Sequence, residues 1–314
     1  MINEKKKNYI ILLIKLVLFF LSCYLIYKNI SSEKNFYSVF KDIELQYLLI
    51  IFFLTTVLIF IQIYIQFKTF LKIKKIKINF NYYSKIFFNS QLASIILPHS
   101  GLVYKAYKLN KFGLPYKDFL NIKLFLAWFY LSYFFLLYSV ELIMFGRDIL
   151  EDYLIMVFFV GISLSSSIFI LPFIFNRYAK SNFTNTFIQK IYNFILNVIL
   201  SPLNYNKLKL FNFLISYGLI SHVISFIIIF LFFLALNLNL NFSLIVLFFV
   251  VNSFLDQVPI TPRNLAVSEL IFGIISSQVG LGFEFGVAIK LFLRIFFFIN
   301  LIVMALIYNI VKDT

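Results

Sequence analysis

The sequence has very few of the residues that build soluble active sites. Among its 314 residues there are two histidines, His99 and His222, and a single cysteine, Cys23. One cysteine excludes a disulfide within the chain and a cysteine metal cluster, and two distant histidines are too few for a histidine metal site. The nine glycines form no nucleotide-binding loop. We therefore expect neither a metal nor a cofactor.

Charged residues are scarce as well. They make up 13% of the chain, whereas hydrophobic residues make up 62% and the mean hydropathy is +0.93. Because a soluble domain contains about 25% charged residues, this composition indicates an all-α polytopic membrane protein, with residues 1–314 forming a single integral membrane domain. Most Lys and Arg residues behind the net charge of +15 lie in short loops, where they orient helices and contact lipid headgroups rather than nucleic acid.

Long apolar segments are abundant, and a membrane-crossing helix needs about 20 apolar residues. The segments that meet this requirement are 8–27, 47–67, 124–145, 153–175, 211–236, 242–258 and 285–310. Two weaker segments adjoin polar interruptions: 86–97, which is too short to cross, and 265–279, which as a full crossing would be the eighth. The sequence thus predicts about seven to eight transmembrane helices with two broken or re-entrant helices.

Basic loops predict the orientation of the chain. Lysines 5–7 precede the first apolar segment, and further lysines flank segment 86–97 on both sides. The positive-inside rule places these regions in the cytoplasm, so segment 86–97 should enter the membrane and return to the same side. The acidic loop at 147–152 is expected outside. The N-terminus is therefore predicted to be cytoplasmic.

The first polar interruption contains Pro98, His99 and Gly101, and Lys105 follows one helical turn later. Lipid tolerates irregular backbone only where protein or a water-filled cavity satisfies the freed backbone groups, so a break of this kind indicates a site inside the membrane. Gly101 permits a close approach of backbone, and His99 is a polar candidate by its position. Lys105 is suited to contact a headgroup phosphate.

The second interruption contains Thr261, Pro262 and Arg263. Thr261 is a favourable N-cap and Pro262 suits the first helical position, which predicts a helix start here that leads into segment 265–279. The N–H groups of a first turn have no internal partners and attract anions, and Arg263 would add a full positive charge. The natural anion at this depth is a lipid phosphate or pyrophosphate.

The two interruptions also resemble each other. An Asn-Ser-x-Leu sequence precedes both of them, at 89–92 and at 252–255. An internal repeat would place two broken helices around one site. Chance similarity in so biased a composition is the alternative.

Charged residues inside the last apolar segments form a further pattern. Lys290 and Arg294 are four residues apart and therefore share one helical face, and Asp256 and Glu269 are the nearest counter-charges in sequence. Charges within a span are costly and face a partner or a cavity. Two interpretations stay open: a static ion-pair cluster that holds the broken helices in register, or direct contact with a substrate.

These motifs resemble a known family. Pro259-x-Thr261-Pro262-x-x-Leu265-x-Val267-x-Glu269, followed by Val279-Gly280-Leu281 and Arg294, is similar to the lysylphosphatidylglycerol synthase transmembrane (flippase-like) family. The earlier Leu97-Pro98, Gly101, Tyr104-Lys105 and Gly113 match the first conserved block of that family. The resemblance implies a bacterial inner-membrane protein with paired re-entrant helices that moves polar lipids between leaflets.

The resemblance also carries over site candidates and shows departures. The carried-over candidates are Pro98, Gly101, Lys105, Pro262, Glu269 and Arg294. Glycines that usually follow the second proline are replaced here by Arg263, Asn264 and Ala266, and Leu102 stands where the first block commonly has an acidic residue. A soluble aminoacyl-transferring domain is absent from this sequence, so we do not expect synthesis of an aminoacyl lipid.

Together these observations predict an inner-membrane lipid translocase rather than an enzyme. It would move an anionic or lipid-linked headgroup, with the phosphate held by Arg263 and Arg294 and the charge balanced by Asp256 and Glu269. The expected partners are a membrane phospholipid or lipid-linked glycan, with glycosyltransferases or lipid-synthesis proteins as candidate associates and no nucleic acid. The alternatives are a membrane enzyme acting on lipid-phosphate substrates and a non-transporting scaffold of a glycan-assembly complex. The sequence does not indicate an oligomeric state.

Overall fold

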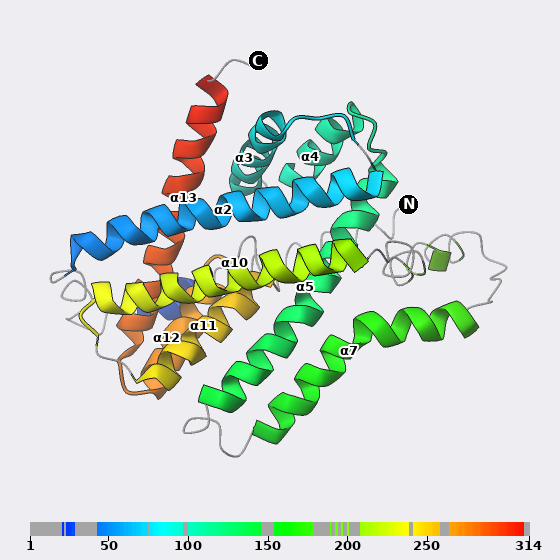
Figure 1. Cartoon of the computed structure of the whole chain (residues 1–314). Coiled ribbons are helices and arrows are strands. Elements are labelled where there is room, and N and C mark those ends of the chain that lie inside the picture. Colours follow the sequence, from blue (N-terminus) through cyan, green and yellow to red (C-terminus); the bar gives the residue numbers. More distant parts are fainter. Residues whose placement is uncertain are drawn as a thin grey trace. The chain divides into compact units, whose positions relative to one another are not determined.

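The regular elements of the chain are helices (Figure 1). A computed structural model describes residues 21, 23–28, 43–74, 76–96, 100–145, 154–178, 189, 192–193, 196, 200, 208–238, 241–257 and 264–310, and no strand occurs among them. In chain order the helices are α2 (Leu45–Lys74), α3 (Phe80–Ile96), α4 (Ser100–Asn110), α5 (Tyr116–Phe145), α7 (Leu154–Tyr178), α10 (Leu208–Ala235), α11 (Phe242–Gln257), α12 (Val267–Gln278) and α13 (Phe283–Ile310). The predicted all-α class is confirmed for these residues.

Four helices of the described part are long and apolar enough to cross a membrane. They are Leu45–Lys74, Tyr116–Phe145, Lys209–Ala235 and Phe283–Ile310. At 1.5 Å per residue each is about 40 Å long or more, which exceeds the roughly 30 Å of a hydrocarbon core. These helices contain the predicted spans 47–67, 124–145, most of 211–236, and 285–310.

The remaining predicted segments have mixed outcomes. α7 contains segment 153–175 apart from its first residue, whereas most of segment 8–27 lies outside the described residues. α11 and α12 are shorter apolar helices of 16 and 12 residues. The described part of each extends only about 18–24 Å, which is less than the roughly 30 Å of a hydrocarbon core. The total number of crossings stays a prediction.

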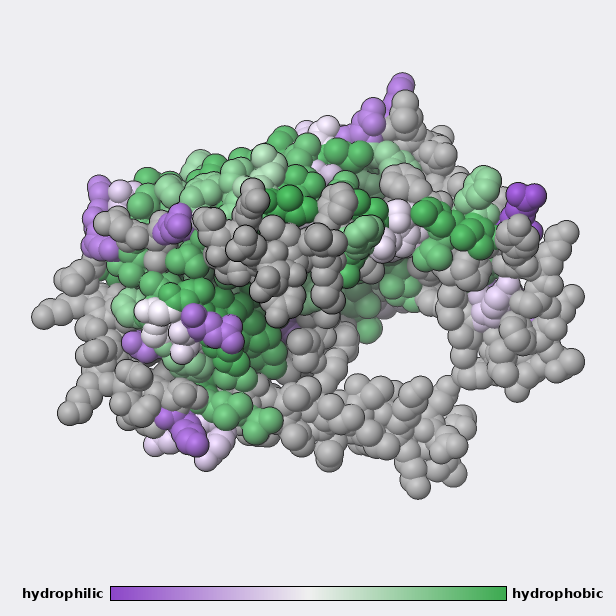
Figure 2. All heavy atoms as spheres, turned by 90° about the horizontal axis from the view of Figure 1, so that it is seen from below, coloured by the Kyte–Doolittle hydropathy of each residue, from purple (hydrophilic) through white to green (hydrophobic). Residues whose placement is uncertain are grey.

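The outward faces of these helices are apolar. Ile295, Ile299, Ile302 and Leu306 on α13 are all exposed, and their spacing places them along one face of the helix. Figure 2 shows hydrophobic side chains over most of the described surface on the face in view. A soluble protein does not expose so continuous an apolar surface, whereas a helix in contact with lipid requires it.

The chain divides into two compact units. One comprises Met1–Val57, Ile95–Pro98 and Ser225–Ile307, and the other comprises Leu58–Ser94, His99–Ile224 and Tyr308–Thr314. Each unit has its own apolar core. Phe248 and Phe272 lie together in the first, with ring centroids 5.5 Å apart, and Phe70 stacks on Phe119 in the second.

Three basic helix ends meet in the second unit. Lys74 at the end of α2 forms an ion pair of 2.9 Å with Asp118 in the first turn of α5. Lys72 donates a hydrogen bond of 3.4 Å to the carbonyl of Lys209 near the start of α10. These contacts place the end of α2 and the beginnings of α5 and α10 together, as the loop charges predict. Which side of the membrane they face stays a prediction.

α3 and α4 form a hairpin in the same unit. The hydroxyl of Ser100, the first residue of α4, donates a hydrogen bond of 2.7 Å to the carbonyl of Ala93 in the last turn of α3. A Cβ atom on Gly101 would lie 1.9 Å from the carbonyl oxygen of Ser90, so only glycine allows the two backbones to pack this closely. The close approach at Gly101 is therefore between two helix backbones, and its role in binding a substrate stays a prediction. α3 begins at Phe80, six residues before the predicted segment 86–97.

In the first unit, α12 packs against α13. A Cβ atom on Gly286 would lie 2.0 Å from the carbonyl oxygen of Phe272, so the α13 backbone touches α12 at this point. α11 also contacts α12. The three helices therefore form one packed group, and their polar residues meet at the beginning of α12.

Candidate functional site

The backbone is broken between α11 and α12. α11 ends at Gln257 and α12 begins at Val267. Asn264 and Ala266 have positive φ angles of 53° and 65°, a left-handed conformation that does not occur within an α-helix. These two residues interrupt the helical backbone, so the described α-helix starts at Val267, two residues after the beginning of the predicted segment 265–279.

Ala266 occupies the N-cap position of α12, and no side chain makes a capping hydrogen bond there. The expected cap, Thr261, lies with Pro262 and Arg263 in the segment 258–263, outside the described residues. A charge contribution from Arg263 therefore stays a prediction.

Asn264 joins the two sides of the break. Its side-chain amide donates a hydrogen bond to the carbonyl of Leu255, one of the last carbonyls of α11, which has no partner within its own helix. The backbone carbonyl of Asn264 accepts hydrogen bonds from Ser268 Oγ at 2.9 Å and from Arg294 Nη2 at 3.2 Å. This one residue thus connects α11, α12 and α13.

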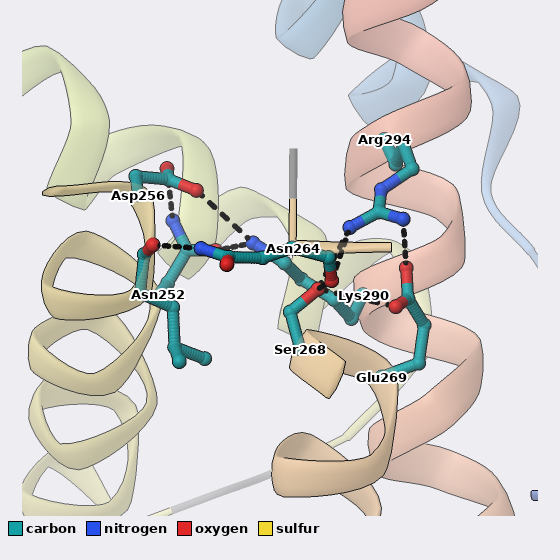
Figure 3. A network of polar contacts seen from close by, with 8 residues as sticks. Asn252, Asp256, Asn264, Ser268, Glu269, Lys290 and Arg294 are labelled. Atoms are coloured by element: carbon teal, nitrogen blue, oxygen red, sulfur yellow. Dashed lines mark hydrogen bonds and ion pairs between the residues drawn. The ribbon is translucent and has the colours of Figure 1, made fainter. Parts of the chain in front are cut away.

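Arg294 and Glu269 form a buried ion pair (Figure 3). Arg294 Nη1 lies 2.8 Å from Glu269 Oε1, and the two side chains are only 10% and 3% exposed. Arg294 Nη2 also donates a hydrogen bond of 2.7 Å to Ser268 Oγ. Glu269 belongs to the first turn of α12, where the positive end of the helix dipole favours a carboxylate. The guanidinium therefore fixes the beginning of α12 against α13.

Lys290 forms the second part of the network, one turn before Arg294 on α13. Its Nζ atom donates to Asn252 Oδ1 at 2.5 Å and lies 3.4 Å from Asp256 Oδ1. The amide of Asn252 donates a further hydrogen bond of 3.4 Å to Asp256. Lys290 is only 7% exposed, whereas the Asp256 side chain is 61% exposed. The network is therefore buried at Arg294 and open at Asp256.

Two cations and two carboxylates make the network formally neutral. An isolated charge among apolar helices is strongly unfavourable, and pairing with an opposite charge offsets that cost. The structure brings together four charged site candidates of the sequence, Asp256, Glu269, Lys290 and Arg294. Chemically, the network can hold a break in place and can present a lysine amine and a carboxylate to a polar group that arrives at its open end.

The candidates of the first interruption belong to the other unit. Pro98 and His99 lie outside the described residues, whereas Gly101 and Lys105 share one face of α4. Lys105 is only 4% exposed, and its Nζ atom donates a hydrogen bond of 2.8 Å to Gln66 Oε1 on α2. The same amine lies over the rings of Tyr83 and Phe87, 4.7 Å and 4.6 Å from their centroids. Lys105 is thus enclosed by protein rather than displayed on a surface.

Four residues of these networks were not among the predicted site residues: Asn252, Asn264, Ser268 and Gln66. Asn252 and Asp256 are four residues apart on α11, and Asn264 and Ser268 are four residues apart across the start of α12, so helical spacing is a signal that relates each pair. Gln66 is a polar residue within a predicted span, which is itself a signal of an interhelical contact. Among the described residues, no three His, Cys, Asp or Glu side chains are placed to hold a metal ion.

Comparison with known proteins gives one match. The family model described as the lysylphosphatidylglycerol synthase TM region matches residues 11–305, nearly the whole chain. No curated protein and no solved structure matches the sequence.

Proposed function

The chain belongs to the lysylphosphatidylglycerol synthase TM region family, and on that premise we propose that it moves a polar lipid headgroup between the two leaflets of a membrane. The family relates this membrane protein to lipid metabolism or transport. The transported headgroup is anionic or belongs to a lipid-linked molecule. The protein works in the bacterial inner membrane with its N-terminus in the cytoplasm. Its role is in cell-envelope lipid or glycan assembly, beside glycosyltransferases or lipid-synthesis proteins.

The open end of the polar network is the observation that supports this proposal most. Lys290 is buried, but its carboxylate partner Asp256 is largely exposed and lies at the longer distance of 3.4 Å. A headgroup phosphate offers the same kind of anionic oxygen and can take the place of Asp256 beside the amine. The headgroup thereby keeps a positive partner while its acyl chains stay in lipid. Without such a partner, a phosphate in hydrocarbon loses its hydration uncompensated.

The buried end of the network has a different role in this proposal. Arg294 has Glu269, Ser268 and the Asn264 carbonyl as partners. These contacts keep the left-handed turn between α11 and α12 from closing into a continuous helix. Arg294 and Glu269 therefore position the break, and Lys290 and Asp256 receive the headgroup.

The α3–α4 hairpin supplies the second broken helix. α3 has 17 residues, about 25 Å, which is less than the roughly 30 Å that a full crossing needs. Its outer ends adjoin the end of α2 and the beginning of α5, which lie together. We propose that the hairpin enters the membrane and returns to the same side.

In this proposal the lipid leaves chemically unchanged, so the protein is not an enzyme. A second candidate function, a non-transporting scaffold, is favoured by one observation: the Arg294–Glu269 pair is closed and buried. Such a pair stabilises a fixed arrangement of helices without any substrate. A membrane enzyme that acts on lipid phosphates is the remaining alternative.

The test is a headgroup-accessibility assay in proteoliposomes. Fluorescent phosphatidylglycerol is placed in both leaflets, and an impermeant reductant added outside quenches only the outer leaflet. Faster quenching of the inner pool with an unaltered lipid supports translocation, and a new lipid product supports the enzyme. If the lipid neither moves nor changes chemically, the result supports the scaffold and contradicts the proposal.

Asp256→Asn and Asp118→Asn form a matched pair of variants for this assay. Each removes one carboxylate beside a lysine, but only Asp256 belongs to the network, whereas Asp118 pairs with Lys74 at a helix end. We expect Asp256→Asn to change the transport rate and Asp118→Asn to leave it unchanged. Equal rates in both folded variants and the wild type would contradict the assignment of the open end.

A further inference from the structure

Two lysines converge on one neutral oxygen in the unit that contains α3, α4 and α5. Lys105 Nζ on α4 donates a hydrogen bond of 2.8 Å to Gln66 Oε1, and Lys123 Nζ on α5 donates one of 3.1 Å to the same atom. The two ammonium groups are therefore no more than about 6 Å apart, a distance at which like charges repel strongly in a poorly hydrated site. Among the described residues, neither lysine forms an ion pair.

This arrangement lacks negative charge. A single amide oxygen is a neutral acceptor, and the rings of Tyr83 and Phe87 offset only part of the charge of Lys105. Asp118, five residues before Lys123 on α5, is already paired with Lys74 at 2.9 Å. A buried positive charge without a counter-charge is costly, and an anion from outside these helices would offset that cost.

A third donor lies beside the lysines. The ring of Tyr83 is 4.7 Å from Lys105 Nζ, and its side chain is completely buried. In the described part of the chain, the Tyr83 hydroxyl has no hydrogen-bond partner. Buried hydroxyl groups nearly always have one, so this atom is available to a ligand. Lys105, Lys123 and Tyr83 are thus three hydrogen-bond donors, and the lysines share one acceptor, Gln66 Oε1.

We propose that Lys105, Lys123 and Tyr83 form a binding site for a phosphate group. A phosphate carries several anionic oxygens, enough to accept from two amines and a hydroxyl at once, whereas a chloride ion lacks that directional match. Lys123 has intermediate exposure and is the more accessible of the two lysines. On binding, the phosphate replaces Gln66 as the shared acceptor and separates the two like charges.

The phosphate comes from a lipid headgroup or from a soluble molecule. The site is near the helix ends where Lys72, Lys74 and the start of α10 meet, a basic region suited to anionic headgroups. Binding here does not depend on translocation, because the residues belong to a different unit from Lys290 and Asp256. It can therefore be measured without a transport assay.

Calorimetric titration of the full chain in neutral detergent tests the site with three probes. The probes are sodium phosphate, dihexanoyl phosphatidic acid and dihexanoylglycerol, which has the same acyl chains but no phosphate. Binding of both phosphate and phosphatidic acid supports a site for which the free anion suffices, and binding of phosphatidic acid alone supports a lipid headgroup as the source. Equal binding of phosphatidic acid and dihexanoylglycerol, or no binding of any probe, overturns the proposal.

Variants locate the binding. We expect Lys105→Met and Lys123→Gln each to weaken binding about tenfold or more, the loss typical of one charge-assisted hydrogen bond, and Tyr83→Phe to weaken it about fivefold. Lys111→Met removes an exposed lysine after α4 and should leave binding unchanged. Wild-type affinity in folded Lys105→Met or Lys123→Gln protein overturns the proposal. In the absence of any anion, the Lys105→Met variant should unfold at a higher temperature than the wild type, because it removes a buried charge. A lower unfolding temperature would contradict the claim that the Lys105 charge is uncompensated.

Discussion

The buried pair of Arg294 and Glu269 allows a sharp test of how charge is accommodated in this protein. Glu269→Gln keeps the size of the side chain and removes its negative charge. Arg294 stays positive, is only 10% exposed, and loses its 2.8 Å carboxylate partner, while its hydrogen bonds to Ser268 Oγ and to the Asn264 carbonyl are with neutral groups. The variant thus measures the cost of removing the directly paired carboxylate from a buried cation.

The expected magnitude follows from the burial of both groups. Removal of one partner from a buried ion pair lowers the free energy of unfolding by about 3 kcal/mol or more. Screening by solvent does not reduce this figure much, because the Glu269 side chain is only 3% exposed. The double variant Glu269→Gln/Arg294→Met removes both charges and should recover part of the loss. Recovery is incomplete, because Arg294 also holds Ser268 and Asn264 in place.

The assay is equilibrium unfolding in mixed micelles with an increasing fraction of denaturing detergent. Glu284→Gln is the matched control, since Glu284 is a buried glutamate in the first turn of α13 that forms no ion pair among the described residues. We expect its effect to stay within about 1 kcal/mol, the size of a helix-dipole contribution. Similar losses for Glu269→Gln and Glu284→Gln would refute the reasoning, as would strict additivity of the two single changes at Glu269 and Arg294.

Three further predictions concern the breaks and the packing of the helices, and unfolding in the same micelles measures each of them. Ala266→Gly should leave the free energy of unfolding unchanged or raise it by up to about 1 kcal/mol, since Ala266 has a φ of 65°. Ala288→Gly, in the second turn of α13, should instead lower it by about 1 kcal/mol. A clear loss for Ala266→Gly would argue against a left-handed residue there. Gly101→Ala should lower the free energy of unfolding by about 3 kcal/mol, because its Cβ would lie 1.9 Å from the Ser90 carbonyl oxygen. Gly113→Ala, at a φ of 86° with open space around it, should lower it by only about 1 kcal/mol. Equal losses would exclude the close packing of α3 and α4. Thr56→Val should lower the free energy of unfolding by about 0.6 kcal/mol, because the Thr56 hydroxyl donates a hydrogen bond to Asn300 on another helix. Thr69→Val should lower it less, because the Thr69 hydroxyl donates to a carbonyl of its own helix. The reverse order would contradict the assigned hydrogen bonds.

Apolar length and helical spacing made much of the fold predictable. The long apolar segments correspond to α2, α5, α10 and α13, because about 20 apolar residues in a row have few alternatives to a membrane helix. The pairing of Lys290 and Arg294 with Asp256 and Glu269 followed from four-residue spacing and from the cost of unpaired charge in lipid.

Features that depend on backbone conformation or on distant contacts were less accessible. Thr261 and Pro262 have the composition of a helix start, but they lie outside the described residues, and the positive φ angles at 264 and 266 that precede α12 have no signal in hydropathy or helical spacing. The glycines that the family usually has at these positions were the available signal, since glycine tolerates a positive φ. The contact of Lys105 and Lys123 with Gln66 joins three helices and has no local signature. The expectation that the two broken helices surround one site stays a prediction, because Pro98 and Pro262 both lie outside the described residues.

The most direct test of the central claim is the rate of headgroup crossing with Lys290→Met. The change removes the amine that receives the headgroup, and the exposed Asp256 tolerates the loss of its partner. In proteoliposomes with equal amounts of folded protein, we expect the wild type to exceed protein-free vesicles and Lys290→Met to be about tenfold slower or more, the effect of one lost charged hydrogen bond. A wild type no faster than protein-free vesicles, or a Lys290→Met variant as fast as the wild type, would contradict the claim.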